Sequence, residues 1–316
     1  MQPRANAVDT AASTHLLFKT GRVPGNAASK NETLEFGGAR NSVQALENNL
    51  DPAKIINCRG HDQYGNRKVH CWKKGGHGKL NLIEAIQKSC NIYFFNLAQE
   101  LGIEKINEVA KRFGYGDEVE IGLDGVSVGN LPNDKWKRKV FNQHWVGGDT
   151  LNCAIGQGFV LATPMQIALA MARFANGGYK IEPSLIKSTR SVDQIASGNA
   201  KKIIKNNAHF NLVSEALNKV VNEKEGTAYY KRIKKEGFEM AGKTGTSQVI
   251  SKRADEMSNS ESKRRKNKNH AIFAGYAPAN DPKYAISVVI EHGGSGSVAA
   301  APVARDVLLR AQELKA

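Results

Sequence analysis

Apolar residues recur at helical spacing through the first two-thirds of the chain. Asn81 precedes such a stretch, and with Glu84 three positions later it forms the pattern of a capping box. Thr163 and Pro164 suit the N-cap and first position of another helix, which should end at residues 176–178. The same spacing predicts further helices over residues 92–101, 104–113 and 211–221. These segments together predict a helical region.

The last third of the chain has the pattern of strands instead. Strands are predicted over residues 242–250, 270–276 and 284–291. Asp281 and Pro282 form a turn between the last two strands, and a helix over residues 304–314 closes the chain. Helices followed by an antiparallel sheet indicate an α+β fold, with a helical subdomain and a sheet flanked by helices.

Two segments lack regular periodicity. Residues 1–44 are poor in regularly spaced apolar positions and rich in Asn, Ala, Gly, Ser and Arg, so we expect loop or disorder there. Residues 45–316 are therefore expected to form the folded domain. Residues 251–269 are dense in Lys, Arg, Ser and Asn and predict a solvated surface loop, with contact to an anionic polymer as the alternative.

The composition is that of a soluble globular protein, with 41% hydrophobic and 24% charged residues among 316. An excess of 45 Lys+Arg over 30 Asp+Glu gives a formal charge of +15. This charge favours anionic partners, such as nucleic acid, an anionic membrane or a cell-wall polymer, without choosing among them. We find no secretory signal and no apolar run of about 18 residues, so we expect nothing in this sequence to export or anchor the chain.

Two short motifs carry candidate chemistry. Residues 243–246, Lys-Thr-Gly-Thr, open a predicted strand, and their ammonium and hydroxyl groups suit a carboxylate. Gly245 leaves the backbone unshielded, so a ligand can lie against it like an added strand. Ser89 and Asn91 are two positions apart on a tight turn between predicted helices and can point into one cleft. Taken singly, each motif is also explained as a chance strand or a helix-breaking turn.

With other segments, these motifs resemble the class B penicillin-binding proteins of the elongation type, often called penicillin-binding protein 2. The further segments, in family order, are His70 to Gly78, Gly148 to Asn152, Ile155 to Gly158, Thr163 to Gln166, Gly226 to Ala228, Phe273 to Pro278 and Glu291 to Gly296. The resemblance implies a penicillin-binding/β-lactamase-like transpeptidase fold, incomplete at its N-terminal side. It also implies a D,D-transpeptidase that cross-links D-Ala-D-Ala stem peptides of peptidoglycan and is a target of β-lactams. The family is anchored in the inner membrane with this domain in the periplasm, and its partners are membrane proteins of the elongation complex.

The resemblance also implies roles for individual residues. Ser89 would relay a proton between the motif lysine and the leaving amine, and Asn91 would hydrogen-bond the donor peptide. Lys243 would give electrostatic support, while Thr244 and Thr246 would hold the terminal carboxylate of the stem. The backbone N–H of Thr246 would form half of the oxyanion hole.

The family's nucleophile motif is missing from the place where we expect it. Ser-x-x-Lys should lie near positions 33–37, shortly before Ala45, but the residues there are Thr-Leu-Glu-Phe-Gly. The segments 184–187 and 260–263 have the right letters, but they follow the Ser-x-Asn motif instead of preceding it. Without the serine and its lysine no acyl-enzyme can form, so we expect catalytic impairment. A frameshift, a wrong start site or a decayed gene would explain residues 1–44.

Cys58, Cys71, His77 and Cys90 form a candidate metal site with the spacing C-x12-C-x5-H-x12-C. Three thiolates and one imidazole complete a tetrahedral Zn²⁺ shell and leave no open position, which indicates a structural metal. Some relatives place metal-type ligands at the corresponding positions. The alternatives are a disulfide or buried free thiols. A metal here would fix the Ser-x-Asn turn, because Cys90 is its middle residue.

Two other functions are compatible with the sequence. A non-catalytic module that binds wall peptides or acts as a scaffold would explain the missing nucleophile. A basic, zinc-containing nucleic-acid-binding protein would explain the charge and the Cys/His set. However, the basic residues are spread along the chain without a recognition helix or aromatic platform, which argues against nucleic acid.

Overall fold

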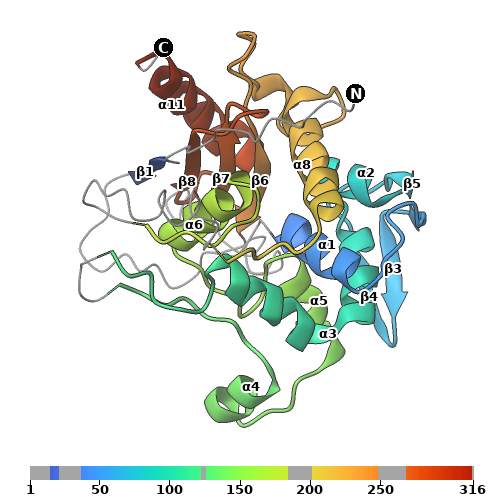
Figure 1. Cartoon of the computed structure of the whole chain (residues 1–316). Coiled ribbons are helices and arrows are strands. Elements are labelled where there is room, and N and C mark those ends of the chain that lie inside the picture. The colour runs from blue at the N-terminus through green and yellow to red at the C-terminus, as the bar shows by residue number, and fades with distance from the viewer. Residues whose placement is uncertain (1–14, 21–36, 122–125, 184–200, 248–267, 315–316) are drawn as a thin grey trace, which may run out of the picture.

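The computed structural model describes residues 15–20, 37–121, 126–183, 201–247 and 268–314 (Figure 1). In chain order the elements are β1 (His15–Thr20), α1 (Gly37–Glu47), β2 (Ile56–Cys58), β3 (His61–Tyr64), β4 (Arg67–His70), β5 (Gly78–Leu80), α2 (Leu82–Gln87), α3 (Asn91–Phe113), α4 (Asp134–Phe141), α5 (Gly147–Ala154), α6 (Pro164–Ala175), α8 (Asn207–Asn222), η1 (Tyr229–Lys231), β6 (Ala241–Ser247), β7 (His270–Ala277), β8 (Tyr284–Ile290), η2 (Gly296–Ala300) and α11 (Ala301–Glu313). One hydrophobic core runs through both the helices and the sheet. The predicted α+β class is confirmed.

The main sheet has the strand order β1-β8-β7-β6. Strands β6, β7 and β8 pair antiparallel, as the sequence predicts, and β1 adds to β8 in parallel. Helices α6 and α11 both pack against β7 and β8 and lie on opposite sides of the sheet in Figure 1. The antiparallel strands are therefore buried almost along their whole length. Among the described strands, β6 is at an edge of this sheet.

The helical part is built around α3, which packs against α1, α5 and α6. Helix α8 contacts both β6 and α2, so it bridges the sheet and the helical part (Figure 1). Two small antiparallel pairs, β2 with β5 and β3 with β4, pack against α2 and α3. At their junction Gly76 has φ 76°, and a Cβ on it would lie 2.1 Å from the Cys58 carbonyl oxygen. The loops there are tight because this backbone approach excludes side chains.

Local sequence rules explain the helix starts. The Asn81 side chain accepts from the Glu84 N–H, and the Glu84 carboxylate accepts from the Asn81 N–H. Thr163 and Gln166 form the same reciprocal pair at the start of α6, with Pro164 at its first position. Each pair satisfies two N–H groups that a helix end otherwise leaves without partners.

The helices predicted over 92–101 and 104–113 are confirmed: α3 consists of two helical stretches that meet at a kink, where Gly102 has non-helical angles (φ 74°, ψ 164°). One secondary-structure prediction needs correction. Loop or disorder was predicted throughout 1–44, but residues 15–20 form β1 and residues 37–44 lie in α1. Helix α1 forms because its residues from Gly37 to Leu46 are nearly all buried against α3 and α8, so packing overrides a weakly periodic sequence.

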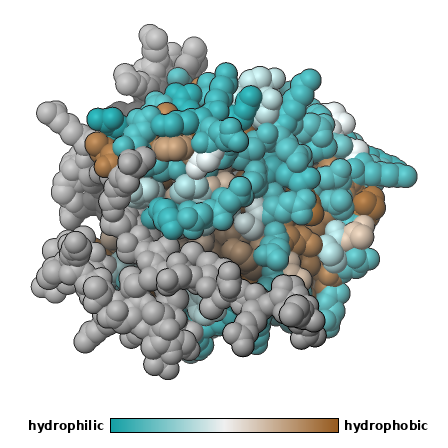
Figure 2. All heavy atoms as spheres, turned by 45° about the horizontal axis from the view of Figure 1, so that its top comes forward, coloured by the Kyte–Doolittle hydropathy of each residue, from teal (hydrophilic) through white to brown (hydrophobic). Residues whose placement is uncertain are grey.

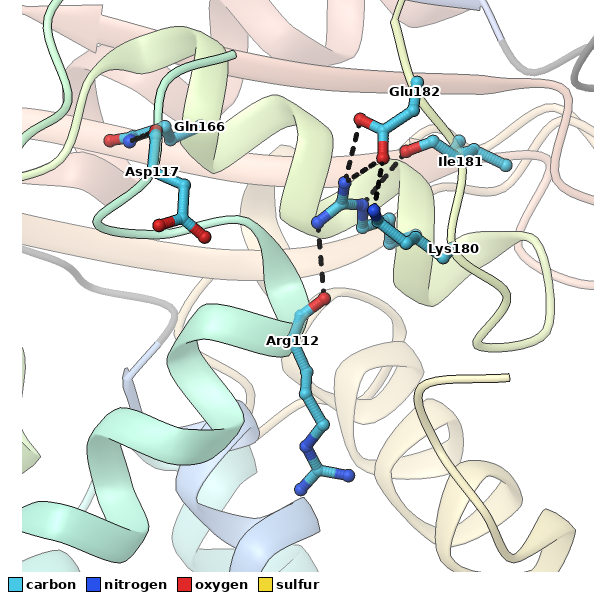
Figure 3. Close-up of polar contacts among 7 residues, drawn as sticks. Arg112, Asp117, Gln166, Lys180, Ile181 and Glu182 are labelled. Atoms are coloured by element: carbon cyan, nitrogen blue, oxygen red, sulfur yellow. Dashed lines mark hydrogen bonds and ion pairs between the residues drawn. The ribbon is translucent and has the colours of Figure 1, made fainter. Parts of the chain in front are cut away.

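Arginine side chains join α3 to α6 and to α1, and Figure 3 shows the contacts between α3 and α6. The buried Arg173 of α6 donates to the backbone oxygens of Arg112 and Ile181 and to the Glu182 carboxylate, at 3.0 to 3.3 Å. Arg112 of α3 in turn pairs with Glu47 of α1 at 2.7 Å. These contacts fix α1, α3 and α6 relative to one another, and we assign them a structural role.

The surface is mainly hydrophilic on the face shown in Figure 2, with hydrophobic side chains gathered toward its right-hand side. Within the described ranges, no helix combines the length and apolar character needed to cross a membrane. Most of the Lys/Arg-rich segment 251–269 lies outside the described residues, which resume at Lys268.

Candidate functional site

The turn between α2 and α3 places Ser89 in an uncommon backbone conformation. Ser89 has φ 54°, in the left-handed region that few non-glycine residues adopt. Its N–H donates to the Ile86 carbonyl at 3.2 Å, and the Cys90 N–H donates to the Ala85 carbonyl at 3.0 Å. The end of α2 therefore holds the turn closed. Left-handed serines of this kind are concentrated at functional sites, where the surrounding structure compensates for the strain.

Strand β6 presents the second motif. Lys243 and Thr244 are only 5% and 8% exposed, while Thr246 is partly exposed. One side of β6 pairs with β7, with Gly245 opposite Ile272. The backbone near Gly245 is also approached by η2, since a Cβ on Gly296 would lie 2.2 Å from the Gly245 oxygen. Strand β6 is thus held by β7 along one side and by η2 near Gly245.

The two motifs meet at Lys243. Its Nζ donates to the Ser89 Oγ at 2.5 Å and to the Thr244 carbonyl at 3.0 Å. Ser89 and Lys243 are 154 positions apart in sequence, so this contact is a product of the fold. We refer to the Ser89 turn and residues Lys243–Thr246 together as the motif site.

Two residues to which the sequence assigned no role contact β6 here. The Thr227 and Thr244 hydroxyl oxygens are 2.7 Å apart, and Gln157 Nε2 donates to the Thr246 carbonyl at 3.2 Å. Both belong to segments that resemble the family, but a contact between remote segments cannot be derived from their spacing. Thr227 is partly exposed, so it lies at the margin of the motif site.

The other member of the Ser-x-Asn motif is less tightly held. Asn91 is the first residue of α3 and is partly buried. Its Nδ2 lies 3.5 Å from the His70 carbonyl oxygen, at the outer limit of a hydrogen bond. The amide is therefore free to form a better bond with a ligand. Its predicted role in holding the donor peptide stays a prediction.

The predicted metal ligands converge. The ligand atoms of Cys58, Cys71, His77 and Cys90 all lie within 4.8 Å of one another, and the three sulfurs are buried. His77 Nδ1 is 3.6 Å from the Cys58 sulfur and 3.5 Å from the Cys71 sulfur. With bonds of about 2.3 Å to sulfur and 2.0 Å to nitrogen, tetrahedral zinc separates such ligands by about 3.6 Å. These four residues can hold a metal ion.

The thiols also influence one another electrostatically. Hydrogen bonding from the Cys90 thiol, with help from His77, lowers the pKa of Cys71. The same interaction and burial raise the pKa of Cys90. The pair thus favours the thiolate at Cys71, which is the form that binds metal. All four cysteines of the chain are free thiols, and Cys153 lies apart on α5.

Trp72 joins the cysteine cluster to the motif site. Its indole N–H is shared between the carbonyl oxygens of Lys88 and Ser89, at 3.1 and 3.0 Å. The same ring contacts the His77 ring edge-on, with centroids 5.2 Å apart. Trp72 therefore ties Lys88, the residue before Ser89, to the cluster, and Cys90, the residue after Ser89, is itself one of the cluster's cysteines. The cluster therefore helps to position the Ser89 turn.

The expected position of the nucleophile motif is mostly outside the described residues. Of the segment 33–37, only Gly37 is described, and it opens α1 without a hydroxyl group. The segments 184–187 and 260–263, which have the Ser-x-x-Lys letters, are also outside the described residues. The absence of the motif from 33–37 is a property of the sequence itself.

Comparison with known families gives one extended match. The family described as the penicillin binding protein transpeptidase domain matches residues 41–309. Among curated proteins, the peptidoglycan D,D-transpeptidase MrdA of Salmonella typhimurium is 35% identical over 247 residues, which are 77% of this chain and 40% of that protein. MrdA of Acinetobacter baumannii is 36% identical over 243 residues, 75% of this chain and 36% of that protein. The chain thus spans about 40% of the length of these relatives.

Solved structures agree with the sequence matches. The penicillin-binding protein PBP2 of Helicobacter pylori, solved in complex with MreC, has a TM-score of 0.78 and 29% identity, covering 90% of this chain and 50% of that one. PBP2 of Pseudomonas aeruginosa, solved in complex with WCK 5153, has a TM-score of 0.73 and 31% identity, covering 87% of this chain and 57% of that one.

Proposed function

Because the chain belongs to the penicillin-binding protein transpeptidase family, with PBP2/MrdA proteins among its relatives, we propose that its motif site binds the D-Ala-D-Ala end of peptidoglycan stem peptides. β-Lactams, which mimic that end, would bind there too. The observation that carries this proposal is the Lys243–Ser89 contact, which assembles the two motif elements beside β6. In this scheme the peptide lies along the β6 edge, and its carboxylate accepts hydrogen bonds from Thr244 and Thr246.

The buried lysine explains why an anion would be favoured. With Lys243 only 5% exposed as a residue, its ammonium group would lose much of its hydration, and a carboxylate nearby would recover part of that free energy. Lys243 would act on the peptide electrostatically, and its bond to Ser89 would keep that hydroxyl available for relaying a proton. Asn91 would hold the amide of the peptide. These are the roles that the family resemblance implies for these positions.

We further propose that this chain is impaired in acyl transfer. In the family scheme a serine attacks the D-Ala-D-Ala carbonyl carbon, its proton passes to a lysine, and D-alanine leaves. Neither residue occurs at positions 33–37. Peptide binding without turnover is the outcome of such a loss, and it would make the chain a module that binds wall peptides.

The same resemblance suggests where the chain would act. H. pylori PBP2 has been solved in complex with MreC, and a peptidoglycan synthase complex that couples polymerization and crosslinking is another similar structure. By analogy, this domain would lie in the periplasm, next to membrane proteins of an elongation complex.

We propose that Cys58, Cys71, His77 and Cys90 bind Zn²⁺. Support comes from the donor set, the mutual distances within 4.8 Å and the nitrogen–sulfur separations near the tetrahedral value. Since all four positions would be filled by protein, the ion would have no place for a substrate. Its role would be structural, to hold the Ser89 turn through Cys90. The ion takes no part in the peptide chemistry.

Binding of N-acetyl-Lys-D-Ala-D-Ala to the purified chain, measured by calorimetry, tests the peptide site. Lys243→Met should weaken binding by about tenfold or more, because a charged hydrogen-bond donor is lost. Lys283→Met is the matched control: that lysine is exposed, pairs with Asp281 and should leave the affinity unchanged. A parent chain that binds no peptide, or a Lys243→Met variant that binds equally well, would refute the proposal.

A further inference from the structure

The segment after α8 contacts both halves of the motif site. We call residues Glu223–Ala228 the strap. On one side Gln87 Nε2 donates to Glu223 at 3.3 Å, and Lys88 pairs with Glu225 at 2.9 Å, both immediately before Ser89. On the other side Thr227 contacts Thr244 of β6 at 2.7 Å. The strap thus contacts both elements that carry the motifs.

The strap has one tightly determined shape. Its Gly226 N–H donates to the Glu223 carbonyl at 2.9 Å, and the Ala228 N–H returns to the Val220 carbonyl of α8 at 3.0 Å. A Cβ on Gly226 would lie 2.2 Å from that Val220 oxygen and 2.3 Å from the Lys219 oxygen. Only glycine fits there, so the backbone places Thr227 firmly. In addition, Asn222 Nδ2 donates to the Met240 carbonyl at 3.0 Å and ties the end of α8 to the start of β6.

The chemistry of two threonines and a carboxylate fixes the direction of the hydrogen bonds. Each threonine hydroxyl has one proton to donate, and an ionised carboxylate can only accept. If Thr244 gives its proton to a carboxylate, it has none left for Thr227. The 2.7 Å contact must then be made by the Thr227 proton, with Thr244 Oγ1 as acceptor.

We infer that Thr227 is a positioning residue that makes Thr244 a donor toward the carboxylate of the bound peptide. It does so by donating its own proton to Thr244, giving a chain from Thr227 through Thr244 to the carboxylate. Hydrogen bonds in such a chain polarise one another, so the terminal donor is strengthened. The inference rests on the proposed function of the motif site, and it names the group that gives this site its preference for a free carboxyl terminus.

The test compares two ligands on matched variants. N-acetyl-Lys-D-Ala-D-Ala and its C-terminal amide differ only in the carboxylate. Thr227→Val replaces the hydroxyl by a methyl group of similar size and should weaken binding of the acid by about 3- to 10-fold, while binding of the amide stays unchanged. Thr227→Ser keeps the hydroxyl and should retain the parent preference for the acid.

A control variant and a double-mutant cycle test whether Thr227→Val acts only by disturbing the structure. Ser214→Ala removes a similar hydroxyl pair, Ser214 with Tyr276 at 3.1 Å on α8 and β7, and should not change the ratio of the two affinities. In a Thr244→Val background, Thr227→Val should have no further effect on the acid, because the two residues act in series.

Equal losses for acid and amide in Thr227→Val, or additive losses in the double variant, would overturn the role of Thr227 while leaving the peptide site intact. A parent chain that binds neither ligand, or binds both equally, would overturn the proposed peptide site and this inference with it.

Discussion

The ammonium group of Lys243 is buried and joins the two parts of the motif site. A buried cation is costly unless hydrogen bonds or an anion compensate it. Among its contacts with described residues, Lys243 donates to Ser89 and to the Thr244 carbonyl. A carboxylate bound along β6 would lie near this ammonium group, which favours anionic peptide ends in the proposed site.

Arg40 on α1 is a buried cation of another kind. It is 1% exposed, its Nε donates to Asn41 at 3.2 Å, and its guanidinium lies 5.9 Å from the ring centre of Tyr115. Within the described residues, its Nη1 has no hydrogen-bond partner. Burial accordingly lowers the pKa of Arg40. None of the motif-site hydrogen bonds described above involves Arg40.

Replacing Arg40 should therefore stabilise the chain. Arg40→Met keeps most of the side-chain volume and removes the buried charge, so the free energy of unfolding should rise by about 1–3 kcal/mol. Urea unfolding followed by circular dichroism measures this. Arg305→Met, on a partly exposed arginine of α11 that pairs with Asp306, should change stability by no more than about 0.5 kcal/mol. A loss of stability in Arg40→Met would show that the guanidinium has a partner it needs.

At the scale of elements, the strap depends on close contact with the end of α8. Gly226→Ala would bring a Cβ to 2.2 Å from the Val220 oxygen and must displace the strap. We expect a loss of about 1–3 kcal/mol in unfolding free energy, together with weaker peptide binding, since Thr227 moves with it. Thermal unfolding and calorimetry test both.

Gly147→Ala is the matched control for that substitution. Gly147 opens α5, its φ is not in the left-handed region, and a Cβ there would meet nothing within 4 Å. Alanine is the better helix former, so stability should stay equal or rise slightly. If Gly226→Ala and Gly147→Ala change the unfolding free energy equally, the close approach of Gly226 to the Val220 oxygen does not stabilise the strap.

Elements were predictable where their signals are local. Asn81 with Glu84, and Thr163 with Gln166, specify helix starts within four residues of sequence, and both pairs form as expected. The three antiparallel strands also follow from their alternating and β-branched residues. Helix α1 was not predictable, because residues 37–44 fold through contacts with α3 and α8 that no local pattern encodes.

For the motif site, the sequence supplied the residues and the fold supplied the contacts. Ser89, Lys243 and the four Cys/His residues were singled out from motifs and residue types, and the structure brings each set together. The Thr227–Thr244 and Trp72–Ser89 contacts join segments with no relation in sequence spacing. Such contacts depend on the packing of α8 and the small hairpins, so only three-dimensional structure reveals them.

In the molecule as a whole, we propose that a metal ion bound to the cysteine cluster holds the β2–β5 loops and the Ser89 turn together. Protein purified under reducing conditions should contain one equivalent of zinc by elemental analysis. A strong chelator should lower the melting temperature by about 5 °C or more, because the metal's binding energy contributes to folding. Peptide affinity should fall as well, since Cys90 lies between Ser89 and Asn91.

Two cysteine variants make that prediction specific. Cys71→Ser should lose the zinc, whereas Cys153→Ser should retain it, since Cys153 is buried apart from the cluster and burial raises its pKa to about 12. Zinc-free protein with a disulfide between Cys71 and either Cys58 or Cys90 would contradict the metal assignment.

We propose that this chain keeps the peptide site of a penicillin-binding transpeptidase domain and lacks its nucleophile. Intact-protein mass spectrometry after incubation with excess benzylpenicillin tests this most directly, on protein already shown to bind N-acetyl-Lys-D-Ala-D-Ala. We expect no increase in mass, because penicillin would bind reversibly without forming an ester. A stoichiometric gain of one penicillin mass would show that a serine nucleophile is present and contradict the claim.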